Sequence, residues 1–261
     1  MKRILIAAAF LAAFAANAQS NKPGKSGFDN SPFDISLEVL PANYRGHDCK
    51  RFAAALKAAK LSKDEYETSE QYTLRTDAWK SNALVGNVKP IDSIAFRRDP
   101  SLHLEYKYNA DEKTLNVWTP EVNKTTAVSG KLSNWDAIDV ISQKESSYKA
   151  ANAYGVTRQV SKTESKVCAI ALSGVHYVPF QYTLRIENIE PSKAKSIKDN
   201  LNIFYVGNID SPYIGTIYDG TSPSLDIPFE TRWTGDAVVM RVKHAWAVDR
   251  RTGEVLGKRD F

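Results

Sequence analysis

The stretch LHLEYKYNADEKTLNVWTP, residues 102–120, alternates apolar and polar side chains on both sides of a polar turn. Apolar residues stand at every second position before and after that turn: Leu102, Leu104, Tyr106, Tyr108, Leu115 and Val117. An alternation of period two is typical of a half-buried strand, and a turn rich in Asn and Asp joins two such strands. The stretch therefore predicts an antiparallel β-hairpin.

From residue 90 onward, the chain on both sides of this hairpin predicts mostly strands. These strands are expected at residues 135–141, 155–160, 167–172, 175–189 and 201–206. Residues 210–228 are rich in Ser, Pro, Gly and Asp and are expected to hold at most short strands. A second hairpin is predicted where residues 237–248 and 254–257 flank a turn, and Gly253 in that turn is expected to have a positive φ.

Helical periodicity comes before residue 90. Five residues recur at the spacing of one helix face: Cys49, Phe52, Ala53, Leu56 and Ala59. Thr68 and Gln71 have the spacing of a capping box, so a second helix is expected to run from there to Asn82 and to bury Tyr72 and Trp79. We expect the two helices to pack as a helical hairpin.

Two shorter elements complete the predicted fold. Residues 33–40 alternate apolar and polar side chains and predict a strand. Pro191 is expected to open a short helix that ends at Asn200, because proline lacks the N–H that the first helical turn leaves unused. The predicted fold is α+β: an N-terminal helical hairpin followed by a mostly antiparallel β-rich region with one short helix.

Residues 1–18 predict a secretory signal peptide. Lys2 and Arg3 precede an apolar run at residues 4–16, and Ala16 and Ala18 are the small residues that a signal peptidase reads. At ~1.5 Å per residue this run is too short to cross a hydrocarbon layer of ~30 Å. Cleavage is expected between Ala18 and Gln19, which predicts a periplasmic or secreted protein.

The rest of the chain is expected to form a flexible arm at residues 19–31 and one α+β domain at residues 32–261. A division of that domain into two subdomains, with a boundary near residues 170–190, is the alternative. No later apolar run is long enough to span a membrane, so the mature chain is expected to have no transmembrane segment.

The composition is that of an ordinary globular protein, with 43% hydrophobic, 25% charged and 10% aromatic residues. The formal net charge is +5. The lysines and arginines form no block of like charge, and a nucleic-acid-binding protein would cluster them on one face. No nucleic-acid partner is therefore expected.

Cys49 and Cys168 are the two cysteines of the chain. An even number of cysteines in an exported protein predicts a disulfide. Two separate buried thiols, or a metal site shared with His47 and His176, are the alternatives.

The familiar signatures of catalysis are missing. The chain has no G-x-S-x-G elbow, and its histidines form no H-x-x-x-H or H-E-x-x-H pair. The carboxylate pairs at 64–65 and 111–112 lie at a predicted helix start and a turn, where acidic residues normally face solvent. The late aromatic residues could form either core or a binding surface: Tyr213, Tyr218, Trp233 and Trp246. No catalytic residue, cofactor or metal is assigned.

A resemblance covers about two-thirds of the chain. Tyr66, Glu67 and Thr68, followed by Tyr72 and Arg75, are similar to the F-E-T-x-x-x-Y-x-x-R pattern of a group of uncharacterised bacterial exported proteins. The segments 152–155 and 191–201 also resemble that group, as does a C-terminal T-G-E-V-L hairpin at 252–256. Tyr66 and Tyr154 stand where the group has Phe. The resemblance implies a bacterial envelope protein and carries no activity.

These observations favour an exported bacterial envelope protein that acts as a non-enzymatic binding or interaction module, with an unknown protein or small molecule as its partner. A hydrolase whose carboxylate and histidine site is assembled by the fold is one alternative. A small-ligand carrier is another. A concave pocket that joins a histidine to two carboxylates would favour the enzyme, and an exposed apolar patch would favour the binding module.

Overall fold

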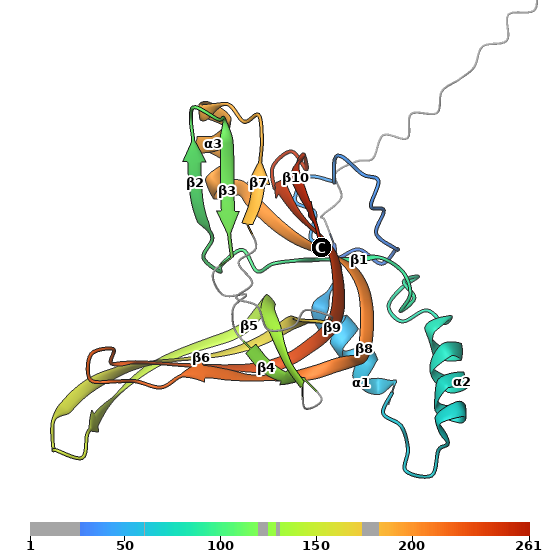
Figure 1. Cartoon of the computed structure of the whole chain (residues 1–261), viewed down its shortest axis with the longest axis horizontal. Coiled ribbons are helices and arrows are strands. Elements are labelled where there is room, and N and C mark those ends of the chain that lie inside the picture. The colour runs from blue at the N-terminus through green and yellow to red at the C-terminus, as the bar shows by residue number, and fades with distance from the viewer. Residues whose placement is uncertain (1–26, 60, 120–124, 129–130, 174–182) are drawn as a thin grey trace, which may run out of the picture.

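The structure, a computed structural model, describes residues 27–59, 61–119, 125–128, 131–173 and 183–261 (Figure 1). Strands make up 51% of it and helices 15%. The predicted α+β class with an N-terminal helical hairpin is therefore wrong, because the described chain is mostly β.

The helices and strands of the described chain, in chain order, are α1 (Cys49–Ala58), α2 (Ser69–Lys80), β1 (Ile94–Arg97), β2 (Glu105–Asn109), β3 (Thr114–Trp118), β4 (Thr125–Val128), β5 (Lys131–Ala151), β6 (Thr157–Leu172), β7 (Thr183–Ile186), α3 (Pro191–Ile197), η2 (Lys198–Asn200), β8 (Leu201–Thr221), β9 (Phe229–Asp249) and β10 (Val255–Asp260).

The described strands form two sheets. The larger sheet has seven strands in the order β1-β8-β9-β6-β5-β4, with β10 paired to β9. The smaller sheet has the order β2-β3-β7. β2 and β3 pair antiparallel with Tyr108 opposite Leu115, which confirms the hairpin predicted from residues 102–120. The hairpin of β9 and β10 is confirmed as well.

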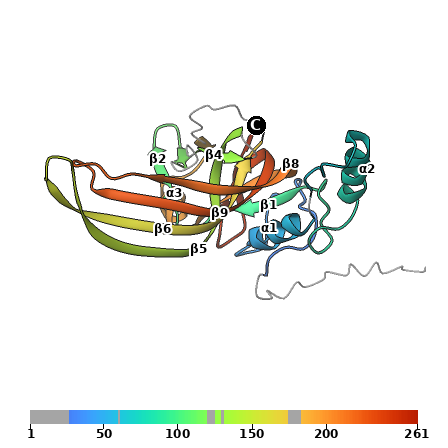
Figure 2. The same cartoon turned by 90° about the horizontal axis from the view of Figure 1, so that it is seen from below.

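Two long hairpins of the larger sheet build an arm that projects from the rest of the molecule (Figure 1, Figure 2). β5 and β6 form one hairpin, and β8 and β9 form the other. β6 joins them by pairing in parallel with β9, from Ser161 opposite Phe229 to Leu172 opposite Met240. The strand order across the arm is thus β8-β9-β6-β5. Its distal end carries the turn 152–156 and the loop 222–228.

The strands of the arm are longer than the sequence predicts. β5 extends ten residues past the predicted end at Ile141, and β8 continues to Thr221 through a region expected to hold only short strands. The outer half of β5 is exposed throughout from Ser142 to Lys149, so its side chains show no apolar alternation. Hydrogen bonds to the neighbouring strands, and not burial of one face, hold these segments as strands.

The two N-terminal helices do not form a hairpin. The buried face of α1 consists of Cys49, Phe52, Ala53 and Leu56, and it packs against the larger sheet. Because the sheet occupies this face, no apolar surface of α1 remains for α2 to cover. α2 lies apart from α1 in Figure 1 and buries only Thr76. Its capping box at Thr68 is as predicted.

Residues 33–40 are not a strand. Phe33 and Leu40 are buried, whereas Ile35, Leu37 and Val39 are exposed. The carboxylate of Asp34 accepts hydrogen bonds from both the N–H and the hydroxyl of Ser36, which turns the chain where a strand would continue. The alternation therefore does not mark one buried face here.

One core joins the two sheets. Leu115 and Leu184 of the smaller sheet belong to the same buried cluster as Ile170 and Val238 of the larger sheet. An ion pair is buried beside this core, with Arg98 Nε 2.9 Å from Asp136 Oδ2. The hydroxyl of Tyr205 donates a further hydrogen bond of 2.6 Å to the same carboxylate oxygen. The short helix predicted from Pro191 is confirmed as α3 and η2.

The described end of the predicted flexible arm contacts the body of the protein. The N–H of Asp29 donates to the carbonyl of Gly46, and the hydroxyl of Tyr44 donates to the carboxylate of Asp29 at 2.8 Å. Residues 174–182, within the predicted boundary between two subdomains, lie outside the described residues. So do the predicted signal peptide and its cleavage position between Ala18 and Gln19.

Candidate functional site

Cys49 and Cys168 are paired in a disulfide. Their Cα atoms are 6.0 Å apart, within the range that a disulfide bridges, and both side chains are buried. The bridge joins α1 to β6 and so fixes the helix on the larger sheet. Both thiols are therefore used in a covalent bond, which leaves neither of them as a metal ligand.

His47 has a structural position beside the edge of β1. Its Nδ1 accepts a hydrogen bond from the N–H of Ala95 at 3.0 Å. Its Nε2 lies 2.9 Å from the carbonyl oxygen of Ser31, which can only accept, so Nε2 carries the proton. The imidazole is buried and continues the hydrogen bonding of the sheet where a strand partner would otherwise lie. His176, the other histidine of the hypothetical metal site, lies outside the described residues.

The described residues contain no group of three or more His, Cys, Asp or Glu side chains that could hold a metal ion. His244 Nδ1 lies 2.6 Å from Asp260 Oδ1 in a simple exposed pair. No residue that the sequence left as a metal-ligand candidate is thus brought into a metal centre within the described chain.

A cleft of about 470 Å³ contains the remaining histidine, His103. Asp99 and Asp199 also line this cleft, so it has the composition that would favour a hydrolase. The carboxylate of Asp99, however, accepts hydrogen bonds from the N–H of Ser101 at 2.8 Å and from the N–H of Val140 at 2.6 Å. Asp99 therefore fixes the backbone, and among the described residues His103 makes no hydrogen bond or ion pair with either carboxylate.

The other carboxylate pairs face solvent. Asp64 accepts a hydrogen bond from the N–H of Tyr66, and Glu65 is exposed. Glu112 forms an exposed ion pair with Arg185 at 3.3 Å. These acids stabilise turns and the protein surface, as the sequence indicates.

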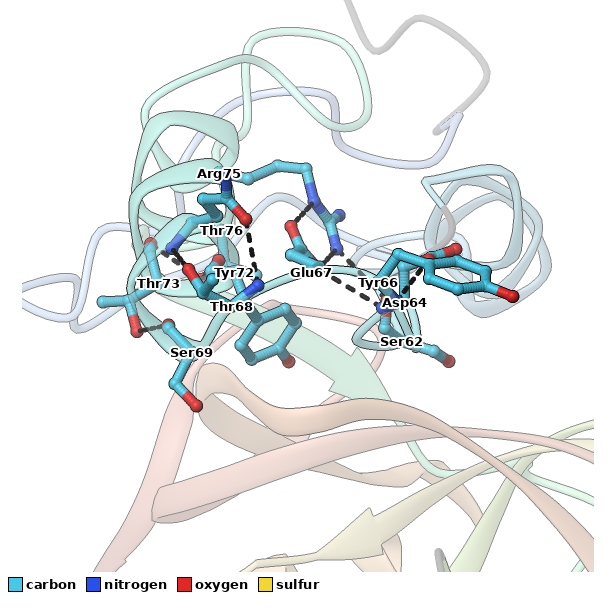
Figure 3. Close-up of polar contacts among 11 residues, drawn as sticks. Ser62, Asp64, Tyr66, Glu67, Thr68, Ser69, Tyr72, Thr73, Arg75 and Thr76 are labelled. Carbon is cyan, nitrogen blue, oxygen red and sulfur yellow. Dashed lines mark hydrogen bonds and ion pairs between the residues drawn. The ribbon is translucent and has the colours of Figure 1, made fainter.

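One of the segments on which the resemblance was based, Tyr66 to Arg75, lies at the start of α2 (Figure 3). Arg75 forms a two-pronged ion pair with Glu67, with distances of 2.8 and 2.9 Å, and also donates to the carbonyl of Ser62. These contacts lower the pKa of Glu67, first through the hydrogen bond from Arg75. Thr68 caps the helix. The guanidinium carbon of Arg75 lies 5.5 Å from the ring centre of Tyr72.

The ion pair and the helix cap account for the spacing of Glu67, Thr68 and Arg75, so no bound ligand is needed to explain it. Glu67 lies just before the N-cap Thr68 and Arg75 lies within α2, so the ion pair fastens the preceding loop to the helix. Tyr66 is the exception, because its side chain is 88% exposed and points away from this network in Figure 3. The resemblance thus describes a structural motif, with one exposed aromatic residue beside it.

The distal end of the arm presents exposed apolar side chains on two segments. We define the distal patch as Tyr154 and Val156 in the turn between β5 and β6, together with Leu225, Ile227 and Phe229 at the loop between β8 and β9. All five side chains are exposed; Tyr154 is 91% exposed and Ile227 is 67% exposed. The N–H of Ser161 donates to the carbonyl of Pro228 at 3.0 Å, which places the loop beside β6.

Hydrogen bonds within the turn and the loop fix the distal patch. The side-chain oxygen of Asn152 accepts from the N–H groups of Tyr154 at 3.0 Å and Val156 at 2.9 Å. In the loop, the N–H of Ile227 donates to the Ser224 hydroxyl, and its carbonyl accepts from the N–H groups of Ser224 and Phe229. The apolar side chains are therefore held out to solvent by ordered backbone.

The strands behind the patch are polar. The hydroxyl of Tyr148 donates to Glu230 at 2.7 Å, and Lys162 pairs with Glu164 at 3.0 Å. The hydrogen bond from Tyr148 is the main cause that lowers the pKa of Glu230. Polar and charged pairs thus cover much of these strands, although Tyr148 and Tyr218 are also exposed on them.

The late aromatic residues divide between core and surface. Trp246 and Tyr213 are buried, and Trp233 packs on Trp135 with ring centres 5.9 Å apart. Only Tyr218 is strongly exposed. The distal patch was not predicted from the sequence. The signal that could have indicated it is the presence of two large apolar residues, Leu225 and Ile227, in a segment rich in Ser, Pro and Asp that has no strand or helix periodicity.

No family model matches the chain, and neither a curated protein nor a solved structure matches it. Among the described residues, no helix has the length and apolar character needed to cross a bilayer.

Proposed function

We propose that this chain is an exported protein of the bacterial envelope and a non-enzymatic binding module that engages a partner protein through the distal patch. The observation that carries the proposal is the display of five exposed apolar side chains on internally hydrogen-bonded segments at the end of a projecting arm. Exposed apolar side chains held on ordered segments at one end of a molecule are a surface that interaction sites use.

The shape of the site favours a protein as the partner. The distal patch lies at a projecting end (Figure 1, Figure 2), so it cannot enclose a small molecule as a pocket does. The partner must supply the pocket that receives Tyr154 or Ile227. Ordered aromatic and aliphatic anchors lose little conformational freedom on binding, which makes them effective interface residues.

Export is supported by the pattern of residues 1–18 and by the Cys49–Cys168 pair. A disulfide persists in oxidising compartments such as the periplasm. The resemblance to bacterial exported proteins supports the same location. In this proposal the protein works in the periplasm or outside the cell.

Site-specific photocrosslinking in living cells tests the binding site. A photoreactive residue replaces Ile227 in one variant and Tyr66 in the control. Tyr66 is also strongly exposed, but it lies just before α2, away from the arm. We expect a discrete adduct with one envelope protein from position 227 and none from position 66. Mass spectrometry identifies the adduct.

Crosslinking from a second position tests whether the other residues of the distal patch contribute to binding. With the photoreactive residue at Phe229, the substitutions Tyr154→Ser and Ile227→Ser should abolish the crosslink, while Tyr66→Ser should leave it unchanged. Equal crosslinking from positions 227 and 66, or an adduct that survives both patch substitutions, would show that the distal patch is not the binding site.

A further inference from the structure

The outer edge of β5 is open along the distal half of the arm. β5 pairs with β6 from Trp135 to Ala151, but on its other side it pairs with β4 only over residues 131–134. Beyond that point, no described strand lies on this edge of the arm, and Figure 2 shows β5 as the outermost strand there. The edge strand therefore presents backbone N–H and C=O groups that lack a strand partner.

The part of this edge nearest the body is closed in another way. The N–H of Asp99 donates to the carbonyl of Ala137 at 3.4 Å, and the Asp99 carboxylate accepts from the N–H of Val140 at 2.6 Å. The ladder between β5 and β6 is also irregular here, with register shifts between Ala137 and Asp139 and between Val140 and Ser142. Bulges and capping side chains are the usual protection of a sheet edge.

The distal part has neither form of protection. From Ser142 to Ala151 the pairing of β5 with β6 is continuous and without a bulge. All but one of these residues are exposed, and no described backbone or side-chain group bonds to their outer edge. A regular and open edge of this kind is a template for adding another strand.

We propose that the added strand is β5 of a second copy of this chain, paired antiparallel about a two-fold axis at Ser147. The two arms then form one continuous sheet. Because β5 runs outward from the body, antiparallel pairing places the two bodies at opposite ends of the dimer.

Symmetry restricts the register of this pairing. A two-fold axis perpendicular to the sheet keeps every side chain on its own face, and side chains alternate between faces along a strand. Only registers in which one residue lies opposite its own copy satisfy both conditions. Among these registers, the two centred on Ser146 and on Ser147 give the longest overlaps that stay within the open segment, residues 142–150 and 143–151.

The register centred on Ser147 brings opposite charges together. With Ser147 opposite itself, Glu145 lies opposite Lys149 of the second copy, and the symmetry repeats the pair. Residues directly opposite each other on antiparallel strands share a face and are close enough to interact. Neither Glu145 nor Lys149 makes an ion pair with another described residue of its own chain, and Glu145 accepts one hydrogen bond, from the side chain of Gln143 at 3.3 Å. The register centred on Ser146 would instead set Glu145 opposite Ser147 and Lys149 opposite Gln143, so it pairs no opposite charges.

This inference goes beyond the proposed function and does not use the distal patch. β8 and the loop 222–228 lie on the opposite edge of the arm, so pairing through β5 leaves Ile227 exposed. Loss of the dimer and loss of the partner crosslink from position 227 are therefore separate outcomes.

Cysteine crosslinking on the axis tests the register. In Ser147→Cys the two new thiols face each other, at a Cα separation of about 4.5–5.5 Å for either type of antiparallel pair, which a disulfide spans. In the control Ser146→Cys the two copies of the residue are diagonal neighbours at about 7–8 Å and cannot bridge. Under mild oxidation we expect a covalent dimer from Ser147→Cys and none from Ser146→Cys.

Charge reversal tests the same contact without a crosslink. Glu145→Lys and Lys149→Glu each replace two attractive pairs by two repulsive ones and should weaken the dimer about tenfold, as light scattering measures across a dilution series. The double variant exchanges the charges and should restore the dimer of the original chain. Circular dichroism confirms that each variant is folded.

A monomer mass at every concentration of the original chain would overturn the proposal. Equal crosslinking of the two cysteine variants would also overturn it, as would a double variant that remains as weak as the single ones.

Discussion

Gly253 shows how one position in a turn is tied to a distant part of the chain. Its φ is +77°, as predicted for the turn between β9 and β10. The structure adds a reason that the sequence does not contain: a Cβ at this position would overlap the carbonyl oxygen of Leu40. The carbonyl of Gly253 also accepts a hydrogen bond from the N–H of Leu40 at 2.8 Å. The N-terminal segment thus packs directly on this turn.

Gly253→Val should lower the free energy of unfolding by about 1–3 kcal/mol, because valine is strained at positive φ and its Cβ displaces Leu40. Gly155→Val is the matched control, because Gly155 has a φ of +78° but no atom near the added Cβ. Urea unfolding of both variants measures the difference. A Gly253→Val variant that is no less stable than Gly155→Val would contradict the role of the Leu40 contact.

Asp249, four residues earlier, makes the stability of this hairpin depend on pH. Burial of the carboxyl acts to raise its pKa, but hydrogen bonds from the backbone and the guanidinium of Arg251 outweigh this effect, so the pKa is lowered. A carboxyl whose pKa is lower in the folded than in the unfolded state stabilises the fold above the unfolded value of about 3.9. That contribution is lost as the pH falls through the folded-state pKa.

Asp249→Asn should therefore be less stable than the original chain at pH 7, and the difference should shrink as the pH is lowered from 5 to 2. Urea unfolding at a series of pH values measures both proteins. A difference that stays constant over this range would mean that the charge of Asp249 does not contribute.

At the scale of elements, the Cys49–Cys168 pair decides how α1 is attached. The bridged residues are 119 positions apart. Closing so long a loop removes much of the freedom of the unfolded chain, about 4–5 kcal/mol in the chain-entropy model, and measured values are usually smaller. The disulfide therefore supports the contact between α1 and the larger sheet, whereas α2 depends on its cap and the Glu67–Arg75 pair.

Denatured but unreduced protein should show no reactive thiol, and reduction should change its electrophoretic mobility without a dimer band. The double variant Cys49→Ala and Cys168→Ala should lose about 2–5 kcal/mol of stability. Two reactive thiols per chain in the unreduced protein would refute the disulfide.

At the scale of the whole molecule, the proposal of export depends on residues 1–18. If they are a signal peptide, the protein recovered from the periplasmic or secreted fraction begins at Gln19. Mass spectrometry of the intact protein measures this directly. An N-terminus at Met1 in most of the recovered protein would exclude cleavage, while the arm and its distal patch would be unaffected.

The sequence by itself determined the elements whose pattern is local. The hairpins at 102–120 and 237–257 follow from apolar alternation around a polar turn, α1 from its apolar face, and α3 from Pro191 at its first turn. The cap of α2 could be predicted from Thr68 and Gln71 because both partners lie within one helical turn. In each case, the residues that specify the element are the ones that form it.

Only the tertiary structure decided the relation between these elements. The helical hairpin was wrong because β6, β8 and β9, which lie about a hundred positions or more further along the chain, pack against the face of α1 that α2 was expected to cover. The long strands of the arm could not be predicted, because their outer halves are stabilised by hydrogen bonds to strands distant in sequence and not by a buried face. The distal patch depends on the same long-range pairing, since only the parallel contact of β6 with β9 brings residues 154–156 and 225–229 to one end of the molecule.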